Sequence, residues 1–372
     1  MRILIVKLSS IGDVVHTLPA ASALRRLLPE ARLSWVVERR ASAILKGSPV
    51  IDDLIEIDSR ALRSRPASRA TLGQVKEYAA LLRGEGESER VDVAIDFQGL
   101  IKSGLVAKVS KAGRRIGFET RELREPPSRL FLTEQVETSH HTHVIDKNIA
   151  LALAALAARS DRLPTPYEFP INVCAEDELY AREVIEESGE RFAIVNPGGG
   201  WPTKLWPAER FGQVADRLWA DHGISSLITY GPGEEDLARA VRAASQTGAA
   251  RPVDSTLKQF VALARRAELF VGGDTGPLHI AAACGTPIVG LYGPTSPERN
   301  GPFDPLDVTV GRDLWCRPLC HRRSCWHWEC MDIPVHEVLE AITLRLARRG
   351  ARDGIKSANG SAGEAFNKLR SL

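Results

Sequence analysis

Two periodicities alternate along the first half of the chain. Runs rich in aliphatic residues predict strands at 2–7, 32–38, 53–58, 91–97 and 114–118. Apolar residues at helical spacing predict helices at 14–28, 41–47 and 99–110. Strands that alternate with helices are typical of a doubly wound parallel sheet, so this half is predicted to form a Rossmann-like α/β domain.

The second half repeats this alternation. We predict strands at 191–197, 225–231, 269–272 and 287–293, and helices at 207–222, 234–246 and 277–284. Between the halves, residues 159–170 hold three prolines in a polar context, which is typical of a linker. The predicted domains are therefore residues 1–165 and 171–349. A tail over 350–372, rich in Gly, Ser, Ala and Lys, is expected to be disordered.

Composition narrows the class of protein. The 372 residues are 44% apolar and 26% charged, as in globular proteins, and are enough for two domains. The net charge of +2 gives no global attraction for nucleic acid, so we expect none as a partner. The longest apolar run, Ile149 to Ala158, is too short to span a bilayer, and Lys7 interrupts the first apolar run. We expect a cytoplasmic protein without a signal peptide.

Two such domains are expected to face a cleft, because ligands bind beyond the carboxyl ends of parallel strands. The first loop at such an end is Leu8 to Asp13. Asp13 could cap the next helix, or it could be a carboxylate that takes a proton from a bound hydroxyl. Ser9 and Ser10 could bind substrate or satisfy the loop backbone.

A second loop, Asn196 to Trp206, contains three consecutive glycines followed by Lys204. Exposed backbone amides and an ammonium group favour a phosphate-binding site, although a flexible turn with a solvated lysine has the same pattern. Trp201 and Trp206 are expected to pack, not to stack on a base.

The third loop is the most specific. A glycine pair is followed by Asp274 and Thr275, and Pro277 suits a first helical turn. The free amides of that helix start would favour a diphosphate, and His279 lies one turn further on.

A fourth loop, Tyr230 to Asp236, carries three acidic residues that either accept ribose hydroxyls or complement a helix dipole. Neither a GxxxxGK[ST] motif nor a well-placed GxGxxG motif is present, which argues against ATPases and dehydrogenases.

Together these loops resemble the lipopolysaccharide heptosyltransferases, glycosyltransferase family 9, most of all the heptosyltransferase I branch. The signatures are KLSSIGDVVHTLPA at 7–20 and GGDTGPLHIAAACGTPIVGLYGPTSPERNGPF at 272–303. The resemblance runs from Arg2 to about Ala347. It implies a GT-B fold and inverting heptose transfer without a metal or other cofactor.

The resemblance also implies roles for individual residues. Asp13 would be the general base, Lys204 would contact the diphosphate of ADP-heptose, and Glu234 would hold its ribose. The third loop would bind the diphosphate and the heptose through Asp274, Thr275, Gly276 and His279.

On the acceptor side the resemblance implies Kdo-lipid A, a lipid-linked sugar. It implies a monomer that contacts the inner face of the inner membrane peripherally. Arg60 and Arg63 belong to a basic run with Arg65 and Arg69, which is predicted to be a loop that is either solvated or acceptor-binding. The predicted acceptor contacts are Ser10, Gly12, Arg60, Arg63 and Arg124.

One feature departs from the heptosyltransferase I pattern. Four cysteines cluster at Cys316, Cys320, Cys325 and Cys330, with His321 and His327 between them. Four thiolates could hold zinc, but the spacing lacks paired CxxC motifs, so reduced thiols are expected and no metal is predicted.

Three other functions stay open from the sequence. They are a different GT-B nucleotide-sugar transferase or epimerase, a heptosyltransferase for already heptosylated core, and a thiol-metal or redox-sensing nucleotide-binding module.

Overall fold

The structure is a computed structural model that describes residues 1–64, 68–84, 90–156, 167–316, 320, 324–326 and 328–348. The predicted tail, Arg65, His321, His327 and most of the predicted linker lie outside these residues, as do the side chains of Arg63 and Arg69. The chain forms two compact units. The first comprises Met1–Asp177 and Glu298–Asn300, and the second comprises Glu178–Pro297 and Gly301–Leu372.

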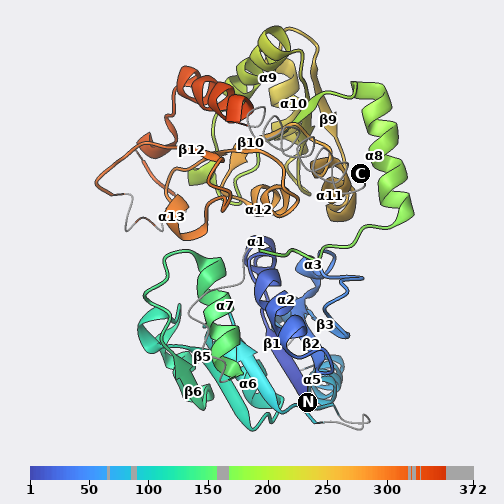
Figure 1. The fold of residues 1–372 in the computed structure, drawn as a ribbon, viewed down its shortest axis with the longest axis vertical. Helices are drawn as coiled ribbons and strands as arrows, with labels where there is room; N and C mark the ends of the chain where they lie inside the picture. The colour runs from blue at the N-terminus through green and yellow to red at the C-terminus, as the bar shows by residue number, and fades with distance from the viewer. Residues whose placement is uncertain are drawn as a thin grey trace, which may run out of the picture. The chain divides into compact units, whose positions relative to one another are not determined.

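The first unit is built on a six-stranded parallel sheet of order β3-β2-β1-β4-β5-β6 (Figure 1). Its strands are β1 (Arg2–Val6), β2 (Arg32–Glu38), β3 (Asp53–Ile57), β4 (Val93–Asp96), β5 (Arg114–Phe118) and β6 (Glu134–Val136). Its helices are α1 (Ile11–Val15), α2 (Leu18–Leu27), α3 (Arg39–Ser42), α4 (Ser59–Ser64), α5 (Arg69–Arg83), α6 (Ile101–Val109) and α7 (Val144–Ala155), with 3-10 turns η1 (Thr120–Glu122) and η2 (Pro126–Phe131).

The second unit has its own six-stranded parallel sheet, of order β12-β11-β10-β7-β8-β9. Its strands are β7 (Phe192–Asn196), β8 (Ser225–Thr229), β9 (Ala250–Val253), β10 (Leu269–Gly273), β11 (Ile288–Leu291) and β12 (Val308–Val310). The helices along this part of the chain are α8 (Ala175–Ser188), α9 (Ala208–His222), α10 (Glu235–Ala244), α11 (Leu257–Ala264), α12 (Gly276–Ala283), α13 (Pro297–Asn300) and one over 335–348, with 3-10 turns η3 (Pro202–Lys204) and η5 (Glu329–Met331).

Both sheets have the same topology. When the strands of each unit are counted in chain order, each sheet runs 3-2-1-4-5-6, the dinucleotide-binding order. Helices cover both faces of each sheet, so central strands are buried throughout and read as continuous apolar runs; β1, β7 and β10 are examples. The predicted α/β class, two doubly wound parallel sheets, is confirmed.

Three local predictions were wrong. The helix predicted over 41–47 is confined to the short α3, and residues 43–47 form turns. The helix predicted over 14–28 is two helices, because the chain breaks at His16 and Thr17 and Pro19 suits only the first turn of α2. The described parts of the basic run predicted as a loop are helical: Asp58 Oδ1 accepts the amides of Arg60 and Ala61 where α4 begins, and Ser68 Oγ accepts the amide of Thr71 at the start of α5.

Among the described residues, no helix is long and apolar enough to cross a membrane.

Candidate functional site

Most of the predicted site residues follow strands at the point where the strand order of each sheet reverses. In the first unit β1 pairs with both β2 and β4, so the loops that leave β1 and β4 diverge there. In the second unit β7 pairs with both β8 and β10. Open α/β sheets bind ligands at this switch point, beyond the carboxyl ends of the strands. Asp13 follows β1, and Lys204 and Asp274 follow β7 and β10.

Asp13 is the third residue of α1 and completes a capping box. Ser10 is the N-cap, and its backbone amide and hydroxyl donate to Asp13 Oδ2 over 2.9 and 3.0 Å. Asp13 is thus not the N-cap itself but its reciprocal partner. Both bonds use Oδ2 of the Asp13 carboxylate, so neither of them occupies Oδ1.

A buried lysine stands beside this carboxylate. Lys7 directly follows β1 and is 4% exposed, and its ammonium donates to Phe97 O over 2.7 Å. Burial lowers the pKa of Lys7, against the charges of Asp13 and Asp96 that raise it. Burial acts to raise the pKa of Asp13, but Lys7 and the Ser10 amide outweigh it and hold the pKa below its usual value. Asp13 is therefore ionised at neutral pH.

The loop after β4 holds the loop after β1. Gln98 Oε1 accepts the amides of Leu8 and Ser9 over 3.0 and 3.2 Å. Asp96 Oδ1 in turn accepts the amides of Gln98 and Gly99, and Ser103 Oγ donates to its Oδ2. Burial outweighs these bonds and raises the pKa of Asp96 to about 6. Gln98 thereby positions the backbone that precedes Ser10, the N-cap residue that donates to Asp13.

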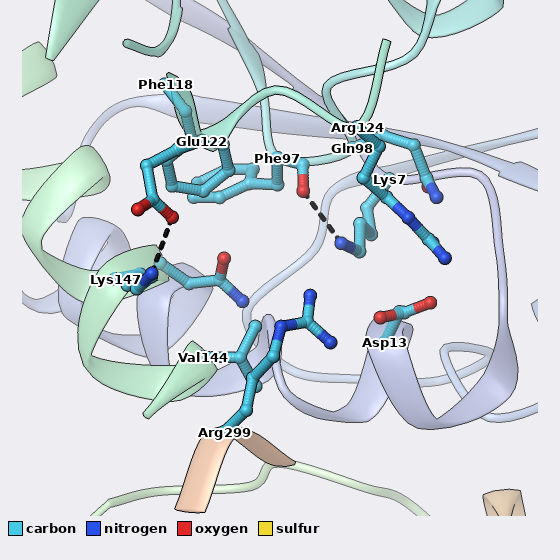
Figure 2. Close-up of a pocket in the computed structure, with 11 residues that line it drawn as sticks. Lys7, Asp13, Phe97, Gln98, Phe118, Glu122, Arg124, Val144, Lys147 and Arg299 are labelled. Atoms are coloured by element: carbon cyan, nitrogen blue, oxygen red, sulfur yellow. Dashed lines mark hydrogen bonds and ion pairs between the residues drawn. The ribbon is translucent and has the colours of Figure 1, made fainter. Parts of the chain in front are cut away.

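A pocket in the first unit opens over these groups (Figure 2). It is lined by Lys7, Asp13, Phe97, Gln98, Phe118, Glu122, Arg124, Val144, Lys147, Asn148 and Arg299, the last within the short segment that clusters with this unit. Figure 2 shows the Arg124 side chain directed toward Asp13, and the Lys7 ammonium on its hydrogen bond to Phe97 O. Glu122 pairs with Lys147, so the remaining cations exceed the single carboxylate of Asp13. The pocket therefore favours an anionic ligand with a polar group near Asp13.

The predicted acceptor residues separate into two groups. Arg124 lines the pocket, and Ser10 and Gly12 belong to the capping loop at its edge. Arg60 is exposed on α4 and is not among the pocket residues. Gly99, in the loop after β4, has a φ of +67°, which favours glycine, and a Cβ there would lie 3.4 Å from the Arg124 amide nitrogen.

In the second unit three predicted residues form one buried cluster. Lys204 Nζ donates to Asp274 Oδ2 and to Asp274 O over 2.6 and 2.8 Å, and His279 Nε2 lies 3.1 Å from Asp274 Oδ1. Burial acts to raise the pKa of Asp274, but His279 and Lys204 hold it well below its usual range. The Lys204 ammonium also lies 4.2 Å from the centroid of the Trp201 ring, while Trp206 is buried in the core.

Glu234 lies against the glycine loop after β7. Its Oε2 accepts the amide of Gly231 over 3.0 Å, and a Cβ on Gly198 would lie 2.5 Å from the same oxygen. Glu234 is also the N-cap residue of α10. The glycine at 198 therefore leaves the space that the carboxylate occupies.

The amides at the start of α12 complete the predicted donor residues. Thr275 is the N-cap, with its hydroxyl directed back to Gly273 O, and Gly276 is the first helical residue. Pro277 occupies the first turn, where the absence of an N–H costs nothing. The helix start thus presents backbone amides at the end of β10, directly after Asp274 of the buried cluster.

Of the four clustered cysteines, Cys330 is buried and the other three are partly exposed. Burial raises the pKa of the Cys330 thiol, and the other three thiols add to this effect. Within the part of the chain that the structure describes, no group of three or more His, Cys, Asp or Glu side chains is arranged to hold a metal ion.

Sequence reasoning missed Lys7 and Gln98 as site residues. Lys7 had a visible signal, because a charged residue inside a buried strand run needs a partner. Gln98 had no comparable signal, because its role depends on β4 lying next to β1, a pairing of residues about ninety positions apart.

Comparisons with known proteins agree with this geometry. Residues 85–327 match the family described as glycosyltransferase family 9 (heptosyltransferase). The chain is 28% identical over 327 residues to lipopolysaccharide heptosyltransferase 1 of Pseudomonas aeruginosa, covering 87% of each protein. It is 28% identical over 304 residues to lipopolysaccharide heptosyltransferase 1 of Escherichia coli K12, covering 82% of this chain and 91% of that protein.

The fold is also similar to that of a solved enzyme. The structure of E. coli heptosyltransferase WaaC with ADP-2-deoxy-2-fluoro heptose aligns with a TM-score of 0.68 and 26% identity, covering 83% of this chain and 93% of that one. The predicted GT-B fold class is confirmed.

Proposed function

The chain belongs to glycosyltransferase family 9, as its motifs predicted, and from this premise we propose that it transfers heptose from ADP-L-glycero-D-manno-heptose to Kdo-lipid A with inversion at the anomeric carbon. The observation that carries the proposal is the carboxylate of Asp13 in a pocket of excess positive charge. The relatives named for lipopolysaccharide heptosyl transfer support the donor and the acceptor class.

The basic pocket supports an anionic acceptor. A Kdo-lipid A acceptor carries carboxylates and phosphates, which Arg124 and Lys7 would attract toward Asp13. Ser10 and Gly12 would contact the acceptor from the capping loop. Arg60 would act only at a distance from this pocket, from the surface of α4.

The second unit supplies the groups for the donor. Lys204 and the amides at Thr275 and Gly276 would hold the diphosphate, Glu234 would accept the ribose hydroxyls, and Asp274 with His279 would fix Lys204 and contact the heptose. The E. coli enzyme whose fold is similar was solved with an ADP-heptose analogue, which supports a nucleotide-sugar donor.

The chemistry follows from these placements. Asp13 takes the proton of an acceptor hydroxyl, and the oxygen attacks the anomeric carbon of the donor from the face opposite ADP. The bond from that carbon to the diphosphate oxygen breaks, and its electron pair leaves with ADP. The Lys204 ammonium and the α12 amides stabilise the charge that grows on the diphosphate. The products are ADP and a glycoside whose anomeric configuration is opposite to that of the donor.

A donor and acceptor panel tests this proposal. ADP release is measured with ADP-heptose or a UDP-hexose as donor, and with Kdo-lipid A, heptosylated core or no acceptor. The proposal predicts release that needs both ADP-heptose and Kdo-lipid A, with a product of inverted anomeric configuration by NMR. Release only with heptosylated core would replace the acceptor, and release with UDP-hexose alone would contradict the donor.

A further inference from the structure

One surface of the first unit is apolar without being covered. Ile101, Leu105 and Leu130 are 44%, 49% and 73% exposed. Ile101 and Leu105 lie four residues apart on α6, so they share one face of that helix. Next to that face α6 packs closely on η2, because a Cβ on Gly104 would lie 2.8 Å from the Phe131 ring. Leu130 precedes Phe131 in η2, the turn that packs on α6, and we call Ile101, Leu105 and Leu130 together the α6–η2 face.

Exposed cations flank this face. The segment 99–132 contains eight Lys and Arg residues and three Glu residues, and Lys102, Arg114 and Arg121 among them pair with carboxylates. Lys108 is exposed one turn beyond Leu105, with its ammonium 5.7 Å from the centroid of the Phe131 ring. Arg129 is exposed beside Leu130. Exposed apolar side chains that adjoin the cations Lys108 and Arg129 match an interface that offers anionic headgroups above an apolar layer.

The α6–η2 face also adjoins the pocket that contains Asp13. The amide of Ile101 donates to Glu125 Oε2 over 2.7 Å, and the amide of Glu125 donates to Gly99 O over 3.0 Å. These bonds join the start of α6 to the start of η2. Arg124, which lines the pocket, immediately precedes this junction. An acceptor whose sugar reaches Asp13 would therefore leave the pocket beside the α6–η2 face.

We propose that the α6–η2 face lies on an anionic lipid surface, with Leu105 and Leu130 inserted among the lipids and Lys108 and Arg129 on the headgroups. This rests on the proposed function, because a lipid-linked acceptor keeps its acyl chains in the bilayer while its sugar is at Asp13. Exposed leucines gain from burial in an apolar layer, and each nearby cation gains from an anionic surface.

Vesicle binding tests the proposal. The full chain is sedimented with vesicles of phosphatidylethanolamine and phosphatidylglycerol, and with phosphatidylcholine vesicles. The L105S/L130S variant is expected to bind the anionic vesicles at least tenfold more weakly than the unaltered chain. K108E/R129E is expected to bind them more weakly, and added salt is expected to weaken binding of the unaltered chain. A matched control is L27S/L81S, because Leu27 and Leu81 are 50% and 46% exposed elsewhere in the same unit.

The proposal is overturned if the unaltered chain does not bind anionic vesicles, or if the control variant loses binding as much as L105S/L130S. It is also overturned if the leucines mediate concentration-dependent self-association, which would make a second copy the occupant.

Activity on two acceptors separates this proposal from the proposed function. L105S/L130S is expected to raise KM at least tenfold for Kdo-lipid A in vesicles, while kcat/KM for a deacylated, water-soluble acceptor stays unchanged. Equal loss on both acceptors would show damage to the pocket and would contradict a lipid-contacting role. No activity of the unaltered chain on either acceptor would refute the proposed function, and vesicle binding would still report on the α6–η2 face.

Discussion

Asp96 shows how a buried carboxylate can serve a site without touching its ligand. Its oxygens accept two backbone amides and the Ser103 hydroxyl, and those bonds fix the turn from which Gln98 reaches the loop before Asp13. The cost is that an ionised carboxylate is buried, which raises the pKa of Asp96 to about 6.

The raised pKa predicts a pH effect on stability. The folded state binds a proton at Asp96 between its unfolded value of 3.8 and about pH 6, so the free energy of unfolding falls as pH rises through 6. From pH 5 to pH 8 this loss is about 1 kcal/mol. Asp96→Asn keeps an acceptor for both amides and removes the titration.

Denaturant unfolding of the unaltered chain and of Asp96→Asn at pH 5 and pH 8 measures this change in the free energy of unfolding. The difference between them isolates Asp96 from Asp307, whose pKa is also raised to about 6, chiefly by burial. We expect the unaltered chain to lose about 1 kcal/mol relative to Asp96→Asn between the two pH values. A constant difference would show that Asp96 does not titrate in this range.

At the same scale, side chains that follow strands directly could be predicted, and those that depend on distant pairings could not. Asp13, Lys204 and Asp274 each follow a buried run within a few residues, so their position at a strand end was visible. The contact of Lys204 with Asp274 was not, because it links residues 70 positions apart across the β7–β10 pair.

At the scale of elements, the turn after β7 has a glycine at 198, against which the Glu234 side chain packs. Gly198 approaches the Glu234 carboxylate so closely that a Cβ would lie within 2.5 Å of Oε2 and 2.8 Å of Oε1. Glu234 has a flexible side chain, so the turn would keep its shape while the carboxylate moved away.

If Glu234 holds the ribose as we propose, Gly198→Ala is expected to weaken ADP binding about tenfold, because a displaced carboxylate would no longer accept the ribose hydroxyls. Titration calorimetry with ADP measures the affinity. Gly113→Ala is the control, since its Cβ would meet nothing closer than 3.9 Å. Unaltered affinity in Gly198→Ala would remove Glu234 from the donor site.

Elements with a clear period were predictable, and elements at the sheet margins were not. The central strands are buried on both faces and gave continuous apolar runs. The edge strands β6 and β9 read EQV and ARPV, so neither shows a strand pattern, and Pro252 is tolerated in β9 only because that strand lies at the edge. Helices α4 and α5 were missed because their start depends on the caps Asp58 and Ser68 inside a run of Arg, Ser and Pro.

At the scale of the whole molecule, two units of identical topology carry different chemistry. The first places a carboxylate among cations at its switch point, and the second places an ammonium and helix amides at the equivalent point. Strand order alone would make both units nucleotide-binding candidates. The side chains at the strand ends distinguish a unit suited to proton removal from one suited to a diphosphate.

The most direct test of the central claim compares the unaltered chain with Asp13→Asn in ADP release from ADP-heptose in the presence of Kdo-lipid A. The carboxamide oxygen that this substitution introduces can still accept the Ser10 amide, so the capping loop should persist, but the side chain no longer takes a proton. We predict that kcat falls at least a hundredfold while ADP affinity stays within twofold. Turnover of Asp13→Asn at the rate of the unaltered chain would contradict the account.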